Sequence, residues 1–123
     1  MQIILLGIFG LLGTLSRYAL QGWVQHQAGA TFPSGTMAVN LLGCFLIGGL
    51  NRLALEHLWF PAEWRVALTI GFLGAFTTFS TFGFETFRML EDGEWAGRAL
   101  YVSISVIGGL MAVMAGMKLA ELI

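Results

Sequence analysis

Three groups of uncharged polar residues stand out because each lies within an apolar stretch of the chain. They are Thr36 and Asn40; Thr77, Thr78, Ser80 and Thr81; and Tyr101, Ser103 and Ser105. Hydroxyl and amide groups can donate hydrogen bonds without carrying a formal charge, so successive groups of this kind could form a polar track. In an apolar solvent they are tolerated chiefly where they meet a partner or line a cavity. The alternative is structural, since Ser and Thr also bond to carbonyls of their own helix and Asn can join two helices.

The second group lies where a regular helix is doubtful. Gly71, Gly74 and the successive hydroxyl residues weaken a helix. A broken helix would free backbone carbonyls, which could bind a cation inside the protein. Phe79 and Phe82 flank these hydroxyls at positions i and i+3. The edge of an aromatic ring is weakly positive and can face an anion, although such rings more often pack in a core or face lipid.

The composition indicates the solvent in which these groups lie. Hydrophobic residues make up 57% of the 123 residues and charged residues 11%, whereas soluble domains contain about 25% charged residues. We therefore predict an all-α membrane protein. The net charge of -1 leaves no basic face for nucleic acid. Cys44 has no second Cys or His at ligand spacing, which excludes a disulfide framework or a zinc site.

Charge spacing predicts four membrane crossings. The uncharged stretches are residues 1–16, 18–51, 66–84 and 99–117, and one spanning helix needs about 20 apolar residues. A polar loop is expected to divide the second stretch, formed by Gln21, Gln25, His26, Gln27 and the turn residues 32–35. The predicted helices of this single domain, residues 1–123, lie near 2–23, 36–56, 64–90 and 96–121. Glycines such as Gly7, Gly48 and Gly116 are expected on the faces where these helices pack closely. The first segment lacks a cleavage pattern and is expected to be retained.

The basic residues are shared equally between the two sides of the predicted bundle. Arg52, Arg65 and Lys118 fall on the side of the amino terminus, and Arg17, Arg88 and Arg98 fall near the opposite side. Because Lys and Arg near helix ends usually set the orientation, this balance predicts insertion both ways round. Two antiparallel copies could then form a dimer with its two-fold axis in the membrane plane. A balance arising by chance is the alternative.

Two strings resemble those of the Fluc (CrcB) family of fluoride channels: Gly-Thr-x-x-Val-Asn at 35–40 and Gly-x-x-Thr-Thr-Phe-Ser-Thr-Phe at 74–82. The resemblance covers essentially the whole chain in length, number of segments and motif spacing. It implies a passive fluoride-selective channel of the bacterial inner membrane, not an enzyme, which lowers cytoplasmic fluoride. It also implies an antiparallel dual-topology homodimer with two fluoride pores and a sodium ion at its centre.

Carried over by position, the resemblance implies roles for individual residues. The backbone carbonyls of Gly74 and Thr77 would hold the sodium ion. The fluoride path would contain pore phenylalanines and hydrogen-bond donors: Asn40, Phe79, Ser80, Thr81, Phe82, Tyr101 and Ser105. Gly83 and Gly109 stand where the family often has Ser, so the length of the polar track is left open.

The implied mechanism constrains the charged residues. Fluoride holds water tightly, so a pore must return comparable hydrogen bonds and still release the ion. A fixed cation in the pore would trap the anion. We therefore expect anchoring roles near the helix ends, with Arg17 reaching the interface and Glu85 paired with Arg88. A vestibule role is the alternative for Glu85.

Two other classes of protein fit less well. A small multidrug transporter also has four helices and dual topology, but it needs a carboxylate in the first helix, and the first acidic residue here is Glu56. A helical accessory subunit would leave the polar groups unexplained. His26 and His57 are expected in loops without a nucleophile or metal-ligand partner at useful spacing, which argues against an enzyme.

Overall fold

The computed structural model describes residues 1–56 and 60–123, and its regular structure within these ranges is entirely helical. Four segments are long and apolar enough to cross a membrane: Gln2–Ala28, Ser34–Glu56, Ala62–Glu91 and Trp95–Ala120. Their bounds lie within five residues of the predicted ones. The predicted all-α class and the four crossings are therefore confirmed.

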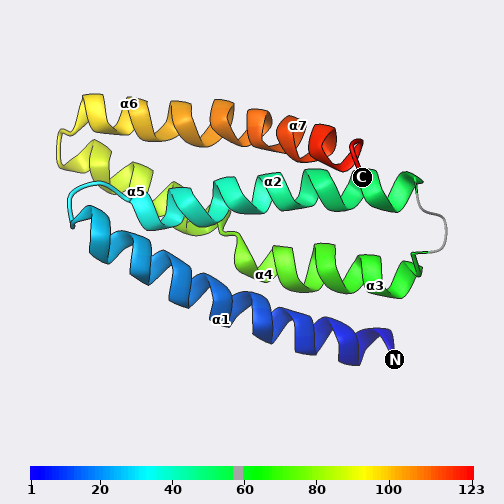
Figure 1. Ribbon diagram of the computed structural model, residues 1–123. Coiled ribbons are helices and arrows are strands. Elements are labelled where there is room, and N and C mark those ends of the chain that lie inside the picture. Colours follow the sequence, from blue (N-terminus) through cyan, green and yellow to red (C-terminus); the bar gives the residue numbers. More distant parts are fainter. Residues whose placement is uncertain (57–59) are drawn as a thin grey trace.

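The first two crossings are single helices and the last two are segmented. The first pair consists of α1 (Gln2–Ala28) and α2 (Ser34–Glu56). The third crossing contains α3 (Ala62–Val66), the π-helical η1 (Ala67–Leu73), α4 (Gly74–Phe76) and α5 (Phe79–Glu91). The fourth contains α6 (Trp95–Ser103), the π-helical η2 (Ile104–Gly108) and α7 (Gly109–Ala120). Both chain termini lie at one end of the bundle, and the α1–α2 and α5–α6 turns lie at the other (Figure 1).

The end of α1 differs from the prediction. The helix continues through Gln21, Gln25 and His26 to Ala28, so the expected loop over these residues is wrong. The helix extends five residues beyond the predicted end at residue 23, and the Gln25 side chain organises the loop that follows. Its amide nitrogen donates to the carbonyl of Phe32 at 2.9 Å, and its amide oxygen accepts from the N–H of Gly35 at 3.0 Å. His57 lies outside the described residues.

Close helix packing depends on glycine at the contact points. α2 packs along α7, and α1 packs along η1 and α4. A Cβ atom on Gly48 would collide with the backbone of Val113, and one on Gly116 would collide with the carbonyl of Phe45. Since a methyl group would push the helices apart, these glycines set the interhelical distance. Within the described part of this chain, nothing lies within 4 Å of a Cβ atom placed on Gly7, so the packing expected there is not found between its described helices.

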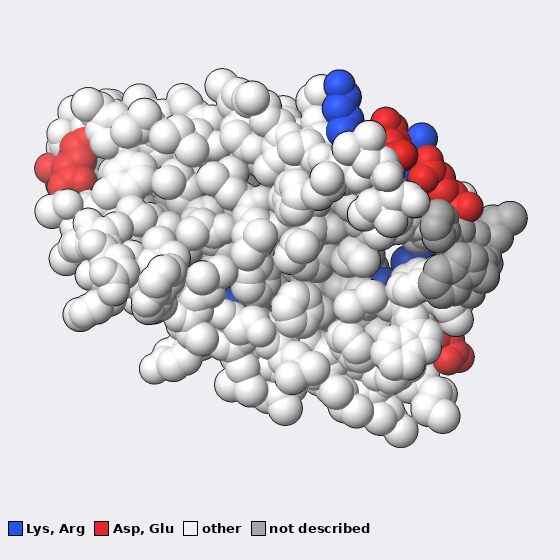
Figure 2. All heavy atoms as spheres, viewed as in Figure 1, with Lys and Arg blue, Asp and Glu red and all other residues white. Residues whose placement is uncertain are grey.

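The outer surface suits a lipid environment. Figure 2 shows that charged side chains gather at the two ends of the visible face, leaving its broad middle almost free of charge. At one end, Arg52 pairs with Glu56 at 2.8 Å and with Glu121 at 3.3 Å, which joins the ends of α2 and α7. Large apolar side chains are exposed along the outer helix faces. The chain is therefore a multi-pass membrane protein.

Candidate functional site

The third crossing contains two consecutive extended residues near its middle. Thr77 has φ -95° and ψ 162°, and Thr78 has φ -150° and ψ 110°. The Thr78 side chain caps α5, because its hydroxyl oxygen accepts from the N–H of Thr81 at 3.2 Å. This geometry gives α5 a separate beginning inside the bundle.

Asn40 of α2 is paired with this extended stretch. Its amide nitrogen donates to the carbonyl of Thr78 at 3.0 Å, and its amide oxygen accepts from the N–H of Thr78 at 2.8 Å. Both backbone groups of Thr78 thus find a partner on one side chain. Unpaired backbone groups are costly in a membrane, so Asn40 stabilises the extended conformation.

The same arrangement leaves two carbonyls without their usual helical donors. In a continuous helix, the carbonyls of Gly74 and Thr77 would accept from the N–H groups of Thr78 and Thr81. Those N–H groups donate instead to the side chains of Asn40 and Thr78. The carbonyl oxygens of Gly74 and Thr77 therefore fit a hard cation, which prefers oxygen ligands. Among the described residues, no cluster of three His, Cys, Asp or Glu side chains could hold a metal ion.

A cavity of about 380 Å³ lies beside this junction. Its walls include many of the residues predicted from sequence: Asn40, Gly74, Thr77, Phe79, Phe82 and Ser105. The ring centroids of Phe79 and Phe82 lie 5.9 Å apart. The hydroxyl oxygen of Ser105 is buried and has no hydrogen-bond partner within the part of the chain that the structure describes. We call this space the phenylalanine cavity.

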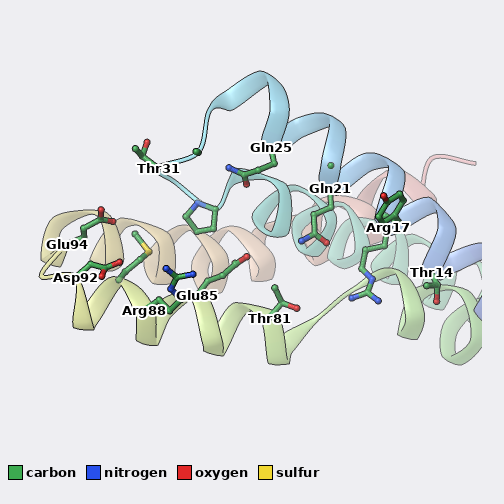
Figure 3. A pocket seen from close by; sticks show the side chains of 15 residues that line it. Thr14, Arg17, Gln21, Gln25, Thr31, Thr81, Glu85, Arg88, Asp92 and Glu94 are labelled. Atoms are coloured by element: carbon green, nitrogen blue, oxygen red, sulfur yellow. The ribbon is translucent and has the colours of Figure 1, made fainter.

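A second cavity of about 900 Å³ lies toward the α1–α2 turn and carries many more polar groups. We call it the polar cavity. Its walls come from α1, the following loop, α5 and the turn after it: Thr14, Arg17, Gln21, Gln25, Thr31, Thr81, Glu85, Arg88, Asp92 and Glu94 are among them. Figure 3 shows the Arg17 side chain extending from α1 toward the start of α5. Arg17 lines the polar cavity and lies well before the end of α1, so the expected position near a helix end is wrong.

Glu85 has different partners from those expected. Its two carboxylate oxygens accept from the hydroxyl groups of Thr36 and Tyr101, each at 2.8 Å. Within residues 1–56 and 60–123 no ion pair joins it to Arg88, so the predicted pairing is wrong. The physical reason is that hydroxyl groups on α2 and α6 meet the carboxylate inside the bundle, while Arg88 is exposed on α5.

The remaining predicted residues divide between the two cavities and the core. Thr81 lines the polar cavity, and its hydroxyl oxygen accepts from the Thr78 hydroxyl at 2.9 Å. Ser80 is exposed and lines neither of the two cavities. Tyr101 is fully buried and also lines neither of them. Tyr101 instead contacts one lining residue of each cavity, Glu85 of the polar cavity and Phe82 of the phenylalanine cavity.

The sequence contained a signal for the polar cavity that the prediction did not use. Arg17, Gln21 and Gln25 recur at intervals of four residues, which places them on one face of a helix. The structure shows that all three line the polar cavity. A polar stripe of this kind on an otherwise apolar helix indicates contact with water or protein.

Comparison with known proteins adds independent information. A family model described as CrcB-like protein, Camphor Resistance (CrcB), matches residues 4–117. A fluoride-specific ion channel FluC of Geobacter metallireducens is 48% identical over 121 residues, which cover 98% of each chain. The protein of the same name from Geotalea daltonii is 49% identical over 121 residues, again 98% of each chain. That from Nitrosococcus oceani is 48% identical over 122 residues, covering 96% of this chain and 94% of the relative.

Proposed function

The chain belongs to the CrcB-like family, and we propose that it is a fluoride-specific channel that conducts the ion passively and so lowers cytoplasmic fluoride. The observation that carries this proposal is near-complete coverage by relatives named fluoride-specific ion channels, at 48% identity or more. The four membrane crossings agree with it. The names of these relatives describe an ion channel and not an enzyme. Ion conduction makes and breaks no covalent bond.

The proposed route for fluoride connects the two cavities. The polar cavity admits the hydrated ion. Its walls contain the acidic residues Glu85, Asp92 and Glu94 as well as Arg17 and Arg88, and Arg17, at the opposite end of the cavity from Asp92 and Glu94, would attract an anion (Figure 3). Thr81 lines the polar cavity and lies between Phe79 and Phe82 in α5. Asn40, Phe82 and Ser105 line the phenylalanine cavity, and the Ser105 hydroxyl has no hydrogen-bond partner among the described residues. Hydroxyl and amide donors and positive ring edges would replace part of the lost hydration.

The proposed assembly is an antiparallel dual-topology homodimer in the bacterial cytoplasmic membrane. The Phe79 side chain supports a partner copy, since it is 83% exposed although it lines a cavity containing polar groups. A second copy across this face would enclose the cavity and keep the ion from lipid. The equal sharing of basic residues between the two sides also supports two orientations.

The proposed structural ion is sodium, bound by the carbonyls of Gly74 and Thr77. Two carbonyls from one chain are too few for a stable site, and a two-fold dimer would supply four. A bound cation supplies positive charge that balances the carbonyl dipoles. The chain's own contribution is to keep these oxygens free of helical donors, which it does through Asn40 and Thr78.

Efflux from liposomes tests the function. Purified protein is reconstituted, and the release of fluoride and of chloride is measured under matched gradients. We expect rapid fluoride release and chloride release close to that of protein-free liposomes. Folded protein that releases neither ion, or both at the same rate, would exclude the proposal.

A further inference from the structure

A continuous set of side-chain contacts crosses the interval between the two cavities. It begins at Gln21, whose amide nitrogen donates to the Thr36 hydroxyl at 3.2 Å. Thr36 and Tyr101 both donate to Glu85. The Tyr101 ring then lies against Phe82, with 5.2 Å between the ring centroids. Glu85 lines the polar cavity and Phe82 lines the phenylalanine cavity.

The carboxylate of Glu85 is held firmly in one position. Hydrogen bonds to an ionised acceptor are shorter and stronger than those between neutral groups. Each oxygen of Glu85 receives such a bond at 2.8 Å, and the donor Thr36 is 1% exposed. Because Thr36 comes from α2 and Tyr101 from α6, the carboxylate fixes α5 against both neighbours.

The Tyr101 side chain transmits this position to the phenylalanine pair. The residue is 0% exposed, and its ring contacts the rings of both Phe32 and Phe82. The Phe32 contact is edge-to-face, with 5.7 Å between centroids. When its hydroxyl is fixed, a tyrosine with two side-chain torsions has little freedom left. The orientation of the Tyr101 ring in turn limits the positions open to Phe82.

We propose that Glu85 is a positioning residue for conduction. It accepts a hydrogen bond from the Tyr101 hydroxyl and thereby fixes the orientation of the Phe82 ring. This inference rests on the proposed function, because the ring matters as part of an ion path. The Glu85 side chain serves as a hydrogen-bond acceptor for Tyr101. Its negative charge is not the feature that conduction requires.

Two neutral replacements of similar shape separate the acceptor from the charge. Glu85→Gln removes the charge but keeps a carbonyl oxygen that can accept from Tyr101. Glu85→Met removes both the charge and the acceptor. Tyr101→Phe removes the same hydrogen bond from the other side and keeps the ring.

Fluoride efflux per folded protein is measured for these variants and for the Glu85→Met/Tyr101→Phe double variant. We expect Glu85→Gln to stay within about twofold of the wild type. Glu85→Met and Tyr101→Phe should each be about tenfold slower, as expected for loss of a hydrogen bond to a charged group. The double variant should be no slower than the slower single variant.

Three results would overturn the inference. Equal rates for Glu85→Gln and Glu85→Met would mean that the acceptor does not matter. A normal rate for Tyr101→Phe would remove the proposed intermediate. Multiplying effects in the double variant would show that the two residues act independently.

A second readout follows the ring itself and needs no ion flux. 4-Fluorophenylalanine is placed at position 82 and its fluorine NMR signal is recorded in detergent. We expect the signal to shift or broaden in Glu85→Met and Tyr101→Phe but not in Glu85→Gln. The same label at Phe9, which packs on Trp64, is the control and should not change.

This readout separates the two proposals. If wild-type protein released no fluoride while the label at position 82 still responded, the channel function would fail and the positioning contact would stand. A label at position 82 that does not respond, in protein that releases fluoride, would refute the inference alone.

Discussion

Asn40 and Thr78 form a closed pair, in which one side-chain amide bonds both backbone groups of a residue on another helix. The two distances are 3.0 Å and 2.8 Å. The amide therefore takes the place that a neighbouring peptide would occupy in a sheet. Through this pair, α2 holds the extended residues between α4 and α5.

This pair predicts a large effect of Asn40 on stability. Asn40→Ala leaves the N–H and the carbonyl of Thr78 unpaired inside the bundle, so we expect a loss of about 2 kcal/mol in the free energy of unfolding. Asn51→Ala is the matched control, because the Asn51 side chain is exposed and bonds to Ile47 of its own helix. It should cost less than about 0.5 kcal/mol. Denaturant unfolding in detergent measures both, and equal stability of the two variants would contradict the structural role of Asn40.

The phenylalanine pair is predicted to serve conduction more than folding. Isoleucine retains most of the apolar bulk but lacks the positive ring edge. We expect Phe79→Ile and Phe82→Ile to purify in the wild-type oligomeric state and to release fluoride much more slowly, at least one of them being nearly inactive. Phe87→Ile on the exposed outer face is the control and should release fluoride normally. Wild-type rates in both pore variants would place the path elsewhere.

Sodium dependence is predicted from the carbonyls of Gly74 and Thr77. Protein purified without sodium should be less stable or release fluoride more slowly, and lithium or potassium should restore it poorly. Stability and flux that are both indifferent to sodium would count against the site.

Dual topology is predicted from the equal sharing of basic residues. A reporter fused to the carboxyl terminus should be detected on both faces of the membrane. Arg65→Gln leaves two basic residues on one side against three on the other and should favour one orientation. Arg65 is exposed at the start of the third crossing, so its loss should not disturb the core. Detection of the wild-type reporter on one face only would refute the prediction.

The crossings could be predicted from sequence because a bilayer imposes both length and apolarity on each helix. Much of the phenylalanine cavity could also be predicted, since Asn40, Phe79, Phe82 and Ser105 all line it. The end of α1 could not, because it depends on hydrogen bonds from Gln25 to a loop several residues away.

One further error comes from the use of helix spacing in place of tertiary contacts. The i, i+3 spacing favoured Arg88 as the partner of Glu85, but hydroxyl groups from two other helices donate to the carboxylate.

The central claim, passive conduction selective for fluoride, is tested most directly by the reversal potential in a planar bilayer. Current is recorded across a tenfold fluoride gradient with chloride equal on both sides. A fluoride-selective channel should reverse about 59 mV from zero, the Nernst value for one charge. Adding a chloride gradient should leave this value unchanged. A reversal potential near zero under the fluoride gradient, or one that follows chloride, would contradict the account.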